Sequence, residues 1–222
     1  MEQILGNSEI SDWIGSKNTS CGIVDIVTAE LINSTIGKKP NEDFKNGDPL
    51  PPLWHWFAFP SATHISQLGD DGHPKHVGYT PPKDLTRRMW ASGSLTFHSN
   101  LRVGEEITKD TTVSDIKEKE SQSGKMVFIT YEHKLRNSGN IAITETQNIV
   151  YLQASDTFNP PKKRDVPQPD YPKAKIVISN PLLFRFSALT YNAHRIHYDL
   201  KYAQEIEKYP HLIVHGPLQA LF

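Results

Sequence analysis

Four segments between residues 89 and 152 constrain the fold more than any other feature of this sequence. They are dense in Thr, Val, Ile, Phe and Tyr, the residue types that suit a pleated, half-buried surface. Short turns rich in Ser and Gly separate the later segments, as in a series of hairpins. The expected strands cover residues 89–97, 108–118, 125–137 and 141–152. The sequence therefore predicts an antiparallel meander.

A helix is expected before these strands, at residues 21–37. Its apolar residues recur near helical spacing, and Gly37 supplies a stop signal. The apolar positions are Ile23, Val27, Leu31 and Ile32. A helix followed by an antiparallel meander predicts an α+β domain in which the helix packs on one face of the sheet.

The segment between the helix and the strands, roughly residues 38–85, is rich in Pro and Gly and is expected to be irregular. So long a loop is uncommon in a compact domain unless it is functional. It contains a cluster of acidic residues and histidines: Asp70, Asp71, His73 and His76. Because glycines lie beside this cluster, we expect it to form a polar surface turn.

The overall composition excludes several classes of function. The 222-residue chain has a formal net charge of -1, which gives no electrostatic basis for binding nucleic acid or an anionic membrane. No apolar run approaches the roughly 20 residues that span a bilayer. Cys21 is the only cysteine, which excludes an internal disulfide and a multi-cysteine metal site and fits a reducing compartment. The acidic N-terminus resembles neither a transit peptide nor a secretory signal, so we expect an intracellular protein.

A cluster of prolines marks a boundary late in the chain. Five prolines lie between residues 159 and 172, with a basic triplet among them that we expect to be solvated. We interpret residues 159–173 as a semi-rigid linker. The predicted units are therefore residues 1–158 and residues 174–222.

The second unit is expected to contain several short elements. Residues 176–178 are a strand candidate, and residues 182–189 form a second apolar segment. Asp199 is suited to cap a helix that runs to about residue 208. A further helix is expected to begin near Gly216, because the proline that follows it is favoured in a first turn.

Three residues of this unit are the best candidates for chemistry. His197 has a side chain that titrates near physiological pH, which suits it to accept or donate a proton. Asn192 lies five residues earlier and is expected to orient a water or a hydroxyl. Gly216 offers a backbone N–H at a helix N-terminus, where it stabilises a developing oxyanion. Local packing of His197 is the alternative, and the combination of the three residues favours catalysis.

Two neighbouring positions leave alternatives open. His194 and His197 have a spacing that binds metal on one helix face, but few residues remain to complete such a site, and we expect no metal. The histidines that remain as a third ligand are His211 and His215. Arg195 suits a phosphate or carboxylate of a carrier, and it equally suits an ion pair with Asp199 one turn later.

Two runs of sequence carry a resemblance to a known family. They are residues 186–199 followed by His215-Gly216-Pro217, and residues 87–97 preceded by Asp71-Gly72-His73-Pro74. Over nearly the whole chain they resemble the MaoC-like (R)-specific enoyl hydratase/dehydratase family. The most similar branch contains the type 2 mitochondrial 3-hydroxyacyl-thioester dehydratases and the mesaconyl-CoA or 3-methylfumaryl-CoA hydratases. The resemblance implies a double hot-dog fold, with antiparallel sheets wrapped on helices. It also implies reversible addition of water to an acyl thioester without metal or cofactor.

The resemblance implies roles for individual residues. The family pattern D-x-N-P-x-H has Asn192 at its Asp position and His197 at its His position. Because Asn192 has no carboxyl proton to donate, this sequence departs from the pattern. The resemblance then implies proton transfer by His197, positioning of water by Asn192 and contact of the Gly216 amide with an enolate. Arg195 and His215 are expected to contact the bound substrate.

The expected function is that of a 3-hydroxyacyl-thioester dehydratase in mitochondrial fatty acid synthesis, acting on a coenzyme A or acyl carrier protein thioester. The alternative is a catalytically inactive module that binds acyl thioesters or assists assembly. Whether the chain forms a homodimer is left open at this point. The resemblance implies a mitochondrial location, with the cytoplasm as the alternative. Because few residues follow Gly216, the second hot dog is expected to be truncated at its C-terminus.

Overall fold

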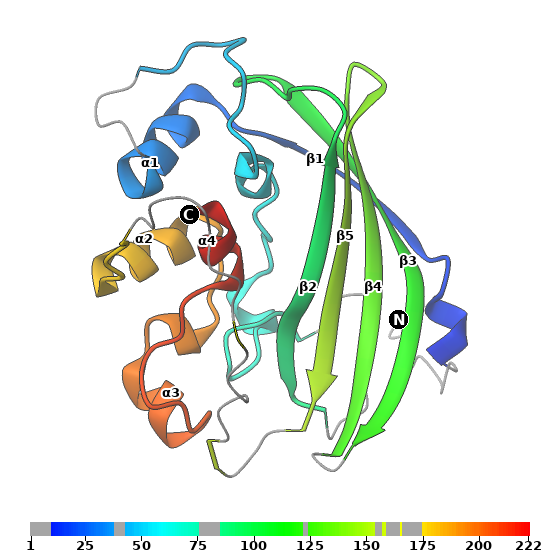
Figure 1. Cartoon of the computed structure of the whole chain (residues 1–222), viewed down its shortest axis with the longest axis vertical. Coiled ribbons are helices and arrows are strands. Elements are labelled where there is room, and N and C mark those ends of the chain that lie inside the picture. The colour runs from blue at the N-terminus through cyan, green and yellow to red at the C-terminus, as the bar shows by residue number, and fades with distance from the viewer. Residues whose placement is uncertain are drawn as a thin grey trace.

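A five-stranded antiparallel sheet forms one layer of the molecule, and the α-helices cover one face of it (Figure 1). The computed structural model describes residues 10–37, 43–75, 85–121, 124–153, 157–158, 165 and 175–222. The spatial order of the strands is β1-β3-β4-β5-β2. Their bounds are β1 Lys17–Ile23, β2 Arg87–Phe97, β3 Glu106–Ser121, β4 Gly124–Asn137 and β5 Asn140–Leu152.

The four strands expected from the sequence are confirmed, each within three residues of its predicted ends. The tightest connection joins β4 to β5, where Asn137 pairs with Asn140. The two residues between them, Ser138 and Gly139, have φ values of 44° and 85°. Positive φ at both central positions matches the right-handed twist of the paired strands. The turn therefore fixes the register of this hairpin.

The N-terminal helix is shorter than predicted. Helix α1 spans Ile26–Ile36, and residues 21–23 belong to β1 instead. Asp25 sets the start of the helix, because its carboxylate accepts a hydrogen bond from the backbone N–H of Thr28 at 2.7 Å. Gly22 pairs in the sheet where a side chain would collide with the carbonyl oxygen of Ala58.

The structure also differs from the prediction in which residues of this helix are buried. Ile32 is fully buried as predicted, but Val27 is 62% exposed and Leu31 is 53% exposed. Ala29 accompanies Ile32 in the core. The packed stripe is narrower than the apolar pattern, because the sheet and its neighbours contact only one side of α1.

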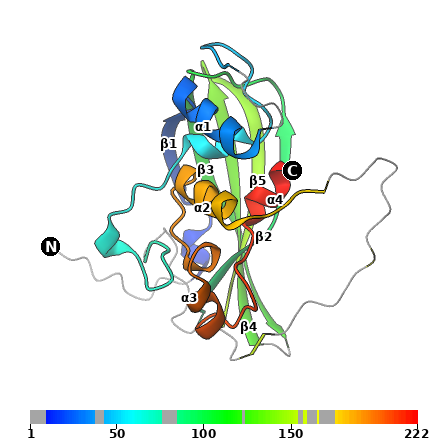
Figure 2. The ribbon, with the colours of Figure 1, turned by 90° about the vertical axis from the view of Figure 1, so that its left-hand side faces the viewer.

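The three remaining α-helices follow the sheet in the chain and lie on the same side of it as α1 (Figure 1 and Figure 2). The α-helices are α2 Asn180–Leu189, α3 Leu200–Glu205 and α4 Gly216–Leu221. The 3-10 helices are η1 Ile10–Trp13, η2 Trp54–Ala58, η3 Ile65–Gln67 and η4 Arg195–His197. In the part of the chain that is described, no helix is long and apolar enough to cross a membrane.

Three predictions for the C-terminal segment have clear outcomes. The prediction of a strand at residues 176–178 is wrong, because these residues are exposed and do not form a strand. The cap by Asp199 is confirmed by a hydrogen bond of 3.0 Å from the Tyr202 N–H, although α3 ends at Glu205 rather than near 208. The helix that begins at Gly216 is confirmed as α4.

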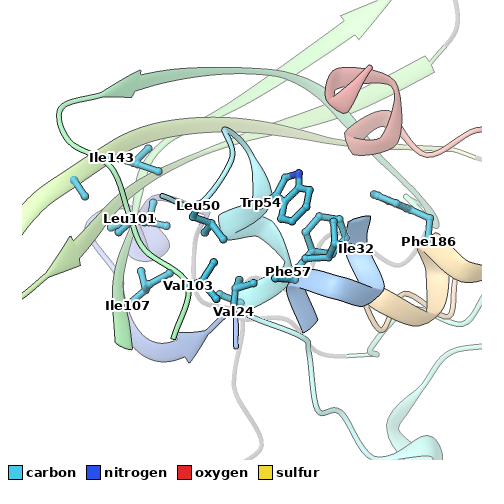
Figure 3. Close-up of a cluster of buried hydrophobic side chains, with 14 of the residues drawn as sticks. Val24, Ile32, Leu50, Trp54, Phe57, Leu101, Val103, Ile107, Ile143 and Phe186 are labelled. Carbon is cyan, nitrogen blue, oxygen red and sulfur yellow. The ribbon is translucent and has the colours of Figure 1, made fainter. Parts of the chain in front are cut away.

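The hydrophobic core joins the two ends of the chain. Phe186 of α2 and Leu218 of α4 belong to the same buried cluster as Ile32 of α1 and Phe57 of η2. Figure 3 shows Phe186 near Phe57, and their ring centroids lie 5.7 Å apart. The C-terminal helices therefore pack on the unit that contains the sheet.

The predicted linker at residues 159–173 lies outside the described residues, apart from Asp165. The division into units at residues 158 and 174 stays a prediction. Among the residues described after Leu152, none is in a strand, and a truncated second hot dog likewise stays a prediction.

Replacement of Phe186 tests the packing of the C-terminal helices on this core. The ring is 1% exposed, so Phe186→Ala is expected to lower the free energy of unfolding by about 3–5 kcal/mol. Phe184→Ala is the matched control on the same helix, because Phe184 is 65% exposed. Urea unfolding followed by tryptophan fluorescence measures both. Equal, small losses in the free energy of unfolding for the two variants would show that Phe186 does not anchor α2 in this core.

Candidate active site

Two adjoining cavities are lined by residues of the sheet and of the C-terminal segment. Their volumes are about 500 Å³ and about 620 Å³. Both are lined by His73, Arg88, Asn192 and His215, so they form neighbouring parts of one cleft. The 500 Å³ cavity also contains His197 in its wall. The cleft therefore brings together residues from opposite ends of the chain.

His197 is held in one orientation by its Nδ1 atom. This nitrogen lies 2.7 Å from the carbonyl oxygen of Ile213. Because a carbonyl oxygen only accepts, Nδ1 carries the hydrogen, and Nε2 is left with a lone pair. The side chain is 7% exposed, and burial lowers its pKa to about 4, despite the hydrogen bond to Ile213. His197 is therefore a neutral imidazole at physiological pH.

His215 lies directly against His197. The two rings stack with centroids 3.6 Å apart and an angle of 19° between their planes. Nε2 of His215 forms a hydrogen bond of 2.9 Å with the Ser187 hydroxyl. Burial, and then the nearby His197, lower the pKa of His215 to about 3. Two neutral rings can stack this closely without repulsion between charges.

Asn192 is positioned by the turn that ends α2. Its backbone N–H donates to the carbonyl oxygen of Ser187 at 2.8 Å. Its side-chain oxygen accepts a hydrogen bond of 3.0 Å from the His194 N–H. The carboxamide nitrogen is then the group that remains to donate into the cleft, whose wall includes Asn192.

Gly216 begins α4 and lines the same cavity as His197. A Cβ atom at this position would lie 2.6 Å from Cε3 of Trp90 on β2. Glycine is therefore required where the start of the helix meets the indole ring. Its N–H belongs to the first turn of a helix, where backbone donors have no carbonyl partner within the helix. The predicted neighbours Asn192, His197 and Gly216 thus share one cavity.

Arg195 has a different environment. Its Nε and Nη2 atoms donate to the Asp199 carboxylate at 3.1 and 2.8 Å, and its guanidinium carbon lies 4.1 Å from the centre of the Tyr202 ring. Arg195 is not among the residues that line the two cavities. The geometry bears out the ion pair with Asp199, and a role in substrate binding stays a prediction.

The sequence pattern misplaced His73. The cluster around it forms the expected turn, in which the Gly72 N–H donates to the Gly69 carbonyl oxygen at 3.0 Å. The side chain of His73 is not on the surface, however, because it is 18% exposed and lines both cavities. The ring lies 4.0 Å from the ring of His194, which in turn lies 5.4 Å from that of His197. The local signal, Asp-Gly-His, gave no indication of this contact because the partner lies about 120 residues later in the chain. His76 lies outside the described residues.

Asp71, His73 and His194 approach closely enough to surround a cation, with side-chain donor atoms within 4.8 Å of one another. Both carboxylate oxygens of Asp71 already accept hydrogen bonds from His73, one from its ring and one from its backbone. This arrangement is complete as a hydrogen-bonded pair, and we assign no metal to it.

The sheet contributes a buried carboxylate to the cleft. Glu145 on β5 is 3% exposed and accepts hydrogen bonds from Trp56 at 3.0 Å and Gln147 at 2.7 Å. His55 lies 3.2 Å from its other oxygen. Burial alone raises the pKa of Glu145, but the hydrogen bonds from His55 and Gln147 outweigh it, so the pKa lies below its ordinary value. The carboxylate is therefore charged, and both of its oxygens already have hydrogen-bond partners.

Arg88 on β2 is a cation in the wall of the cleft, and among the described residues no carboxylate forms an ion pair with it. It lines both cavities. Its Nε atom is buried and has no hydrogen-bond partner within the described ranges. A buried guanidinium donor without a partner is costly, so a ligand oxygen is its natural complement.

Comparison with known proteins decides the family. The family model for hydroxyacyl-thioester dehydratase type 2 matches residues 53–222. The chain belongs to this family. It is 40% identical to the mesaconyl-C(4)-CoA hydratase of Chloroflexus aurantiacus, over 98% of this chain and 78% of that protein. It is 29% identical to the mitochondrial hydroxyacyl-thioester dehydratase type 2 of Schizosaccharomyces pombe, over 76% of this chain and 64% of that protein.

Solved structures support the fold of the family. HtdX from Mycobacterium tuberculosis matches with a TM-score of 0.61 and 16% identity, over 93% of this chain and 73% of that one. A MaoC-like dehydratase from Phytophthora capsici matches with a TM-score of 0.60 and 13% identity, over 95% of this chain and 74% of that one. These structures confirm the expected α+β hot-dog class. The family model and the two relatives confirm the MaoC-like resemblance and the hydro-lyase class.

The buried histidines predict a loss of stability in mild acid. Burial holds the pKa values of His197 and His215 at about 4 and about 3, whereas in the unfolded chain they lie near 6.5. Below about pH 6.5 the unfolded state therefore binds more protons, and the free energy of unfolding falls as the pH drops. Between pH 7 and 5 we expect a loss of about 2 kcal/mol for each imidazole.

Urea unfolding at these two pH values measures this loss. His215→Gln is expected to show a shallower dependence on pH than the wild type. The exposed His211 provides the control, since His211→Gln should leave the dependence unchanged. A wild-type protein equally stable at pH 7 and pH 5 would show that the rings are not held neutral.

Proposed function

We propose that this chain catalyses the reversible addition of water across the 2,3 bond of an acyl thioester. One observation carries the proposal: a neutral His197 ring of fixed tautomer shares a cavity with Asn192 and Gly216. A proton acceptor, a water-positioning amide and a backbone donor are the groups that this reaction requires. Membership in the dehydratase family supports the same reaction class.

In the hydration direction, the Asn192 carboxamide donates a hydrogen bond to the attacking water. Nε2 of His197 accepts a proton from this water as its oxygen bonds to C3 of the substrate. The electron pair of the 2,3 bond moves toward the thioester carbonyl. The Gly216 N–H donates to the carbonyl oxygen, on which negative charge develops. A proton added at C2 then completes the 3-hydroxyacyl thioester.

His215 stacks on the ring of His197 and holds it in position for this step. It packs against His197 at 3.6 Å and stays neutral, so it holds the ring of His197 in place and adds no positive charge beside it. We expect His215 also to contact the substrate, because it lines both cavities.

We propose a coenzyme A thioester whose acyl group bears a second carboxylate as the substrate. The relative at 40% identity is named for mesaconyl-C(4)-CoA, which has such a carboxylate. Arg88, whose buried Nε has no hydrogen-bond partner among the described residues, is a side chain in the cleft suited to bind it. A mitochondrial role in fatty acid synthesis, with an acyl carrier protein thioester, is the alternative. Only the Schizosaccharomyces pombe relative, at 29% identity, supports that role and location.

Loss of the His197 imidazole tests the reaction. His197→Ala is expected to reduce kcat/KM for hydration of an enoyl-CoA by at least about 10²-fold, the lower range for a general acid–base group. The rate is measured from the fall in absorbance as the conjugated enoyl thioester is hydrated. His211→Ala, at an exposed position, should retain wild-type activity. Binding of acyl-CoA without turnover by the wild type would instead support the inactive binding module.

Replacement of Arg88 tests the substrate class. Arg88→Gln is expected to lower kcat/KM for mesaconyl-C(4)-CoA by about 10- to 100-fold, the value of a lost charged hydrogen bond. Crotonyl-CoA has no second carboxylate, and its kcat/KM should change little. Arg185→Gln, on the exposed side of α2, is the control. Equal losses on the two substrates would rule out recognition of a carboxylate by Arg88.

A further inference from the structure

His73 is a second imidazole in the wall of the cavity that contains His197. The proposed hydration moves protons at two different atoms, since the water loses one while C2 gains one. His197 serves the water in the steps above, and the carboxamide of Asn192 has no titratable proton. A further acid–base group at the cleft would therefore complete the reaction.

Asp71 holds the His73 ring in a defined orientation. The ring Nδ1 lies 2.9 Å from one carboxylate oxygen, and the backbone N–H of His73 donates to the other at 3.0 Å. Because a carboxylate accepts, Nδ1 carries a hydrogen and Nε2 is the nitrogen left for chemistry. Burial alone raises the pKa of Asp71, but the hydrogen bond and charge of His73 outweigh it and keep the pKa low. Asp71 is thus a charged acceptor that stabilises positive charge on the ring.

The loop that contains this pair is tied to the histidine segment. The Arg195 backbone N–H donates to the carbonyl oxygen of Asp71 at 2.9 Å, and its Nη1 donates to that of Asp70 at 3.0 Å. Gly72 has a φ of 90° and packs so closely on the carbonyl of Ala193 that a side chain would collide with it. These contacts fix the position of His73 relative to the segment that precedes His197.

From this geometry we infer that His73, positioned by Asp71, is the catalytic residue that exchanges a proton with C2 of the substrate. The inference rests on the proposed hydration. In that direction the cationic His73 ring donates its Nε2 proton to C2, and the electron pair of the enolate forms the new C–H bond. His197 meanwhile retains the proton taken from water. It passes that proton to solvent, and His73 regains one from solvent, so the enzyme is restored.

The charges around His73 are compatible with this role. The groups that face it are Asp71, His194, His197 and Arg88. Burial, and then the charge of His73, lower the pKa of His194 to about 2, so this ring stays neutral beside it. Asp71 supplies the negative charge that balances a protonated His73, at direct hydrogen-bond distance.

The inference predicts a specific change in the pH profile of hydration. His73→Gln is expected to lower kcat by about 10²- to 10⁴-fold with a small change in KM, the range for an acid–base group. The fall in wild-type kcat/KM at high pH should disappear in this variant, which lacks the imidazole. Asp71→Asn should retain part of the activity and move that fall to lower pH, and Asp71→Glu should restore it in part. His64→Gln, at an exposed position in the same loop and outside both cavities, is the control.

The outcomes separate this inference from the proposed function. If the wild type hydrates mesaconyl-C(4)-CoA and His73→Gln does so equally well with an unchanged profile, the role of His73 is refuted and the proposed function stands. If the wild type hydrates neither substrate, the proposed function itself fails. If a chelator abolishes wild-type activity and Zn²⁺ restores it, the cluster works as a cation site and the inference is overturned. Circular dichroism confirms that each variant is folded.

Discussion

The chemistry of this cleft depends on the hydrogen bond between His197 Nδ1 and the Ile213 carbonyl, 2.7 Å long. It fixes which ring nitrogen carries the hydrogen, and so it decides that Nε2 is the basic atom. Burial then removes the alternative of a charged ring at neutral pH. The Ile213 N–H donates in turn to the Ile196 carbonyl at 3.0 Å. The two segments therefore hold each other, and the imidazole cannot rotate without breaking its hydrogen bond to Ile213.

Every other element of the site is arranged around this fixed ring. The stacked His215 is placed by its bond to Ser187 of α2, and α2 is anchored in the core through Phe186. Trp90 of the sheet limits the start of α4 to glycine, and Gly216 lines the cavity there. The site thus forms only where α2 and α4 pack on the sheet, so stability and function depend on the same contacts.

The sequence predicted the features that local patterns encode. Strand segments, the β4–β5 turn, the Asp199 cap and the helix at Gly216 all follow from residues adjacent in the chain. It did not reveal β1, whose pairing with β3 joins residues about 90 apart. The contact of His73 with His194 was missed for the same reason, because a polar loop has no periodicity to indicate its partner. The family motif located Asn192 and His197, whereas their orientation required the fold.

The tautomer and charge of His197 are the most direct test of this account. Nitrogen-15 NMR of histidine-labelled protein, with His197→Gln used to assign the resonance, reports the protonation of each ring nitrogen. The account predicts hydrogen on Nδ1, none on Nε2, and a ring that stays neutral down to about pH 5. Hydrogen on Nε2, or titration at the ordinary histidine value of about 6.5, would contradict it.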